Sequence, residues 1–133
     1  MERRKRMQFW GRDRYDDYLV REVLEGVKTA TACRADEYHL PEGDYDDGDW
    51  HVGDIVEIYD LRERLRCIVE ITEVYPVAFG DIPDKLWIAE ACDSAEHFQE
   101  AHRECWPDID LTDDFLLMAT HFRLVEIVEP DAS

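Results

Sequence analysis

The chain has 133 residues, of which 45% are apolar and 11% aromatic, a composition that suits one folded domain and excludes a disordered chain. No apolar run approaches the roughly 20 residues of a membrane span, and no secretory signal follows the basic start, so we expect a soluble cytoplasmic protein with no membrane partner. A formal net charge of −18 disfavours broad binding to a nucleic-acid backbone, and we expect no DNA partner.

The acid excess is accompanied by a shortage of lysine. The chain has 33 Asp and Glu residues against 15 basic ones, and only Lys5, Lys28 and Lys85 are lysines. Hydrated carboxylates keep a protein soluble where salt screens other charges. This composition predicts a salt-loving source.

The four cysteines are Cys33, Cys67, Cys92 and Cys105. They contain no C-x-x-C pair, so a zinc ribbon and a thioredoxin-type motif are both excluded. In an intracellular chain we expect them to be reduced and buried.

The N-terminal third begins with a basic segment without periodicity. It predicts a mobile arm over residues 1–8, ahead of a domain over residues 9–129. Apolar residues at helical spacing predict a helix over 15–25 that ends at Gly26, and a short β-prone segment follows over 29–33.

The middle of the chain is acidic and then β-rich. Residues 36–49 predict a solvated acidic loop, because the spacing around Gly48 fails the register of a calcium loop. Strands are predicted over 52–59 and over 65–79, the second broken by Pro76.

The C-terminal third predicts two helices and a strand. The helices cover 84–90 and 94–105, the second capped by Asp93 or Ser94, and an apolar strand covers 115–128. Strands dispersed around short helices indicate an α+β fold, a small, partly closed β-barrel with flanking helices.

One motif lies between the first predicted helix and strand. It reads G-x-K-T-x-T and consists of Gly26, Lys28, Thr29 and Thr31. Further segments follow in order: Val52-Gly53-Asp54, Ile71 to Val74 running into Val77 to Phe79, Ala89-Glu90, the helix with His102, and the strand around Phe122. Over roughly residues 9–128 the set resembles the ASCH domain family, which has a PUA-like barrel and is linked to RNA.

The resemblance implies a cleft between barrel and helices for RNA or a modified nucleoside. Some small bacterial members remove the acetyl group from N4-acetylcytidine with a Lys, a Thr and a Glu, which correspond here to Lys28, Thr31 and Glu90. Another member is described as a metal-dependent ribonuclease, and others are regarded as RNA-binding modules. Many members have Gly after the glutamate, where this chain has Ala91.

Amide hydrolysis needs a nucleophile, a base, a donor for the leaving amine and stabilisation of the oxyanion. Thr31 would be the nucleophile, Lys28 the base, and Glu90 the group that orients or protonates the amine. Because alternation on a strand places Lys28 opposite Thr31, Lys28 must lie in the turn after Gly26. Without the resemblance, Thr31 is an ordinary strand residue and Glu90 a solvated acid.

Other residues are expected to contact the substrate. Thr29, Arg34 and His102 are the candidates, although Arg34 also suits a surface ion pair and His102 a structural role. His97 and His102 lie about 140° apart on a helix, which does not suit zinc, so no metal and no cofactor are expected. A cleft tryptophan could stack on a base.

Three hypotheses follow from these residues. The first is a nucleoside amidohydrolase, which tolerates the charge of −18 because a nucleoside carries no phosphate. The second is a non-catalytic RNA-binding module that uses the N-terminal cations as an arm, and the third, ranked lowest, is a metal-dependent ribonuclease.

Overall fold

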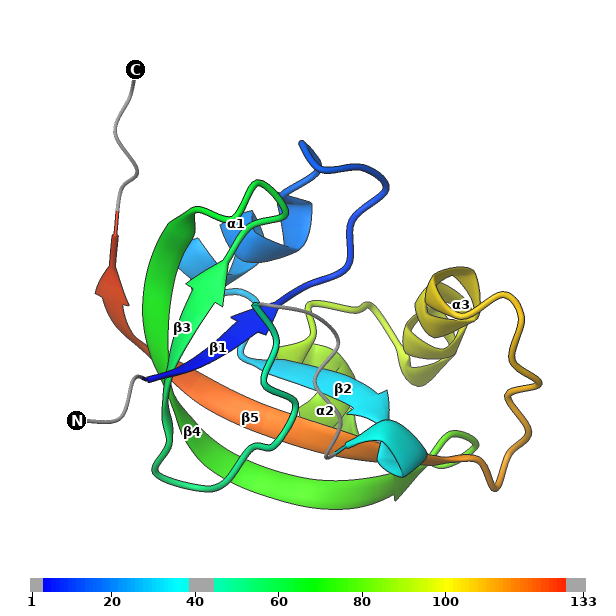
Figure 1. The fold of residues 1–133 in the computed structure, drawn as a ribbon. Coiled ribbons are helices and arrows are strands. Elements are labelled where there is room, and N and C mark those ends of the chain that lie inside the picture. The colour runs from blue at the N-terminus through cyan, green and yellow to red at the C-terminus, as the bar shows by residue number, and fades with distance from the viewer. Residues whose placement is uncertain (1–3, 39–44, 129–133) are drawn as a thin grey trace.

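A computed structural model describes residues 4–38 and 45–128. Its centre is a curled five-stranded sheet of order β1-β3-β4-β5-β2, with the helices packed around it (Figure 1). The strands are β1 (Lys5–Gln8), β2 (Ala30–Arg34), β3 (Ile55–Tyr59), β4 (Leu65–Ala78) and β5 (Leu116–Ile127). The helices are α1 (Tyr18–Leu24), α2 (Asp84–Ala89), α3 (Ala95–Cys105) and the short 3-10 turn η1 (Ala35–Glu37). The α+β half-barrel predicted from the sequence is confirmed.

The long antiparallel pair β4–β5 forms the spine of the sheet. Its register shifts between Ile68 and Val69 and again between Ile71 and Glu73. Such bulges bend a strand and increase its twist, which accounts for the curl. The curl divides the apolar core in two, one cluster under α1 around Ile58 and the other under α2 and α3 around Phe98.

The N-terminal segment corrects one prediction. Lys5–Gln8 are not part of a mobile arm but form β1, which pairs in parallel with β3, while residues 1–3 lie outside the described part. Met7 is 2% exposed, and the Lys5 ammonium lies 2.7 Å from a carboxylate oxygen of Asp54. Buried apolar side chains and pairing with downstream acids therefore fix a segment that lacked a visible period.

Pro76 corrects another prediction, because β4 runs through it to Ala78 without a break. β3 pairs with β4 only as far as Glu70, so at Pro76 one side of β4 has no neighbouring strand in the described sheet. Proline is tolerated where the ladder has such an edge.

The remaining elements agree with the sequence to within a few residues at their ends. Ser94 rather than Asp93 caps α3, accepting a hydrogen bond from the backbone N–H of His97 at 3.1 Å. The predicted acidic loop falls partly outside the described residues, at 39–44. Among the residues that are described, no helix is long and apolar enough to cross a membrane.

Candidate functional site

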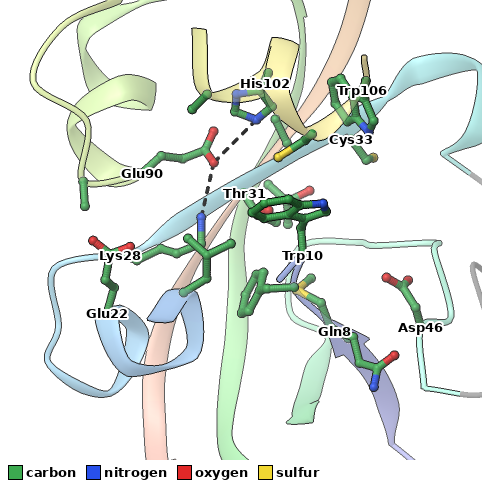
Figure 2. A pocket seen from close by; sticks show the side chains of 18 of the residues that line it. Gln8, Trp10, Glu22, Lys28, Thr31, Cys33, Asp46, Glu90, His102 and Trp106 are labelled. Carbon is green, nitrogen blue, oxygen red and sulfur yellow. Dashed lines mark hydrogen bonds and ion pairs between the residues drawn. The ribbon is translucent and has the colours of Figure 1, made fainter. Parts of the chain in front are cut away.

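A cavity of about 440 Å³ lies between the sheet and the helices. Its walls come from β1, α1, β2, the segment before β3, the end of α2 and α3 (Figure 2). This volume falls in the range of sites for small organic ligands. The described lining includes the aromatic side chains of Phe9, Trp10, Tyr18, Tyr38, Trp50 and Trp106.

A buried ion pair forms one wall of the cavity. The Nζ atom of Lys28 lies 3.2 Å from Oε1 of Glu90 and donates a second hydrogen bond of 2.7 Å to the carbonyl of Ala30. The side chains of Lys28 and Glu90 are 2% and 7% exposed. Since a buried charge requires compensation, the two side chains hold each other in place.

The backbone before β2 places Lys28 in the cavity. Gly26 has a φ of +80°, the left-handed conformation typical of a helix end, and the N–H of Lys28 donates to the carbonyl of Glu22 at 3.1 Å. Lys28 therefore lies in the turn between α1 and β2, as the sequence predicted. Thr29 follows and donates its N–H to the carbonyl of Ala89 at 2.6 Å, which couples this turn to α2.

Glu90 comes directly after α2, and the next residue explains how it is aimed. Ala91 has a φ of +60°, a left-handed conformation unusual for a residue with a Cβ. This is the position where the resembled family commonly has Gly. The turn therefore keeps a glycine-like backbone in spite of the substitution, and Glu90 still reaches Lys28.

The second carboxylate oxygen of Glu90 has no hydrogen-bond partner among the described residues. This atom, Oε2, is buried, and the residue lines the cavity. A buried acceptor without a donor costs free energy, of the order of 1–3 kcal/mol. An N–H or O–H group of a ligand would satisfy it.

His102 contacts the same carboxylate from α3. Its Nε2 atom lies 3.9 Å from Oε1 of Glu90, a contact marked by a dashed line in Figure 2. Its Nδ1 atom lies 2.8 Å from the carbonyl of Phe98. Because a carbonyl only accepts, Nδ1 carries the proton in this contact. The His102 ring stacks on the ring of Phe98, with centroids 4.0 Å apart, and its centroid lies 5.3 Å from the ring centroid of Trp106. His102 is thus fixed in one orientation facing the carboxylate.

Thr31 also lines the cavity, from β2. It is paired in the sheet with Thr120 of β5, a second lining threonine that is 1% exposed and that the sequence analysis did not identify. Cys92 also lines the cavity, but burial raises the pKa of its thiol to about 11, so this thiol is a poor alternative nucleophile.

Two of the expected substrate contacts are not brought to the cavity. Thr29 is absent from its lining, and its backbone instead connects α2 with β5 through Ala89 and Phe122. Arg34 forms ion pairs with Asp36 at 2.8 Å and with Glu37 at 3.0 Å, the surface arrangement that the sequence analysis weighed against substrate binding.

Other lining residues were missed because no local motif marks them. Glu22 lies beside Lys28 in Figure 2, and burial raises the pKa of its carboxyl more than the nearby ammonium lowers it. Gln8 belongs to the segment over residues 1–8 that was predicted to be a mobile arm, and Trp10 follows shortly after it. Within residues 4–38 and 45–128, no group of three or more His, Cys, Asp or Glu side chains could hold a metal.

A curled α+β half-barrel with a cavity between sheet and helices is the architecture of PUA-like domains. The sequence model of the ASCH domain matches residues 5–126, and the chain belongs to that family.

Solved structures agree with this assignment. A protein of Enterococcus faecalis is 22% identical, with 92% of this chain and 77% of the other covered and a TM-score of 0.73. An ASCH domain of Lactobacillus crispatus is 21% identical, with 91% and 80% covered and a TM-score of 0.70. At these identities the likeness establishes the fold. No curated protein matches the chain.

Proposed function

We propose that this protein binds a modified nucleoside in the cavity and hydrolyses an exocyclic amide of the N4-acetylcytidine type. The observation that carries the proposal is the buried Lys28–Glu90 pair in the wall of a cavity of about 440 Å³, with one carboxylate oxygen that has no donor among the described residues. The exocyclic N–H of an N4-acylated cytosine is a donor of the kind that Oε2 lacks.

The chemistry assigns one role to each of three side chains. The hydroxyl of Thr31 attacks the acyl carbon and passes its proton to Lys28, which gives an acyl-threonine and releases cytidine as the amine leaves. Glu90 accepts a hydrogen bond from the substrate N–H, takes a proton from the Lys28 ammonium, and hands that proton to the departing nitrogen. Water then hydrolyses the acyl-threonine, which releases acetate and restores the hydroxyl.

The resting contacts imply how Lys28 would become a base. Its ammonium now donates to both Glu90 and the carbonyl of Ala30. Transfer of one ammonium proton to Glu90 across this 3.2 Å contact leaves a neutral amine on Lys28 and a carboxylic acid on Glu90. The neutral amine is the form that accepts a proton from Thr31, and the acid is the form that protonates the leaving nitrogen.

The cations near the N-terminus support the enzyme over an RNA-binding module. Lys5 is paired with Asp54, and Arg6 lies 3.9 Å from Asp47 and over the ring of Tyr45. Internal acids thus already occupy these side chains, which leaves less charge for a phosphate backbone. We place the reaction in a cytoplasm of high salt content, in keeping with the acidic composition.

The test is turnover of N4-acetylcytidine in molar KCl, followed by chromatography of cytidine. Lys28→Ala and Thr31→Ala should each abolish the product. Lys85→Ala and Thr72→Ala are matched controls at exposed positions outside the cavity lining and should retain it. No turnover by wild-type protein with a native circular dichroism spectrum would contradict the enzyme and favour an RNA-binding module.

A further inference from the structure

The proposed reaction still lacks a group that stabilises the oxyanion. When the hydroxyl oxygen of Thr31 bonds to the acyl carbon, an electron pair of the C=O bond moves to the acyl oxygen, which becomes negative. Enzymes of acyl transfer direct N–H or O–H donors at this oxygen. Lys28 and Glu90 already move the protons of the reaction, so a further donor is needed beside Thr31.

The register of the sheet places Thr120 beside Thr31. The two residues are directly opposite each other on the antiparallel strands β2 and β5. Side chains of opposite residues lie on the same face of a sheet, with their Cβ atoms roughly 4.5–5.5 Å apart. The next residue of β2, Ala32, and the residue before Thr120, Ala119, pack with the apolar cluster under α2 and α3. Because side chains alternate along a strand, the two threonines lie on the other face, where both line the cavity.

Thr120 is buried, but its hydroxyl has no structural use. The residue is 1% exposed, and its hydroxyl forms no hydrogen bond with any residue that the structure describes. Valine has nearly the same shape without the polar group, so packing alone would favour valine at this position. The O–H group of Thr120 is therefore available to a ligand in the cavity.

Other donors of the cavity lining are already engaged. The hydroxyl of Tyr38 donates to the carbonyl of Trp50. The amide N–H of Gln8 donates to the carbonyl of Asp60 at 2.9 Å. Thr120 thus combines an unengaged O–H with a position next to the proposed nucleophile.

We infer that Thr120 is a further catalytic residue, whose O–H donates a hydrogen bond to the acyl oxygen as negative charge develops there. This inference rests on the proposed function. Thr31 forms the new C–O bond and gives its proton to the neutral amine of Lys28, while the acyl oxygen takes the negative charge and accepts from Thr120. The C=O bond then re-forms, the C–N bond breaks, and the nitrogen takes its proton from Glu90. Thr120 keeps its own proton throughout and donates again when water attacks the acyl-threonine.

The experiment measures kcat and KM for N4-acetylcytidine in molar KCl with the full chain. Thr120→Val removes the donor and keeps the shape, so kcat should fall roughly 100- to 1000-fold while KM changes by less than about twofold. Thr120→Ser keeps the O–H group and should retain kcat within about tenfold of wild type. Thr72→Val is the matched control, because it makes the same change at an exposed position of β4 outside the cavity lining and should leave both constants unchanged.

Urea unfolding of the same variants distinguishes catalysis from packing. Because the Thr120 hydroxyl has no partner among the described residues, Thr120→Val should unfold at the wild-type midpoint or above it. A lower midpoint would overturn the inference, since the hydroxyl would then have a structural partner.

The kinetic outcomes separate the inference from the function beneath it. A wild-type kcat in Thr120→Val would overturn the role of Thr120 and leave the amidohydrolase standing. Equal losses of kcat in Thr120→Val and Thr120→Ser would overturn the role of the O–H group. Failure of folded wild-type protein to turn over N4-acetylcytidine would remove the proposed function and the inference together.

Discussion

The buried pair of Lys28 and Glu90 makes a prediction about stability that is independent of any substrate. Lys28→Met removes the partner of a carboxylate that is 7% exposed and leaves its charge buried. It also removes the donor to the carbonyl of Ala30. Breaking a buried pair from one side costs about 3–5 kcal/mol, and we expect the free energy of unfolding to fall by this amount.

The double variant Lys28→Met/Glu90→Leu separates the charge from the packing. Because this variant has no unpaired carboxylate at position 90, its free energy of unfolding should fall by only about 1–2 kcal/mol relative to wild type. Most of that decrease is the cost of the Ala30 carbonyl without its donor. Lys85→Met serves as the control, because it breaks an exposed pair with Glu73 and should cost under about 1 kcal/mol.

The assay is urea unfolding in molar KCl, monitored by tryptophan fluorescence, with the midpoint and slope fitted for each variant. A loss below about 1 kcal/mol for Lys28→Met would refute the reasoning, because it would mean that removal of Lys28 does not leave an uncompensated buried charge on Glu90. A double variant less stable than the single one would refute it as well.

Three further predictions concern positions away from this pair. Burial raises the pKa of Asp60, but hydrogen bonds from Arg64 and Arg66 outweigh it and hold the pKa below its usual value. The stability that the low pKa provides is present above the unfolded pKa of about 4 and is lost as the pH falls through the folded pKa. When the free energy of unfolding is measured as a function of pH below about pH 4, it should therefore fall less steeply for Asp60→Asn than for wild type. Parallel curves for the two proteins would contradict this. Ala91→Gly should raise the free energy of unfolding by about 1 kcal/mol in urea, because it relieves a φ of +60°, and a lower midpoint would show that the residue is unstrained. Burial raises the pKa of the Cys67 thiol to about 12, so Cys67 should resist labelling by a thiol reagent at about pH 8 until urea unfolds the chain. Rapid labelling of Cys67 in the native protein would be inconsistent with the structure.

The parts of the site that follow local rules could be predicted from the sequence. Gly26 marks the end of α1, and strand alternation then requires Lys28 to lie in the turn before β2. Glu90 could be proposed only from its place in the resembled motif, because a single acid in a chain with 33 Asp and Glu residues carries no signal of its own.

The parts that depend on long-range pairing could not be predicted. Thr120 becomes a cavity residue because β5 pairs with β2 in the register that sets it opposite Thr31. β1 forms because Met7 finds a buried position beside β3, which no feature of the first eight residues indicates. Pro76 fits a continuous β4 only because β3 ends before reaching it.

The place of β2 in the sheet has a consequence for the order of folding. β2 is an edge strand whose sheet partner is β5, and Ala30 pairs with His121, roughly ninety residues later in the chain. While the chain is being synthesised, the turn with Lys28 emerges early but has no strand to dock on until β5 follows. Contacts so distant in sequence close slowly and late. The wall that contains Lys28 is therefore assembled in one of the last steps, and a chain stalled before β5 would lack the complete cavity.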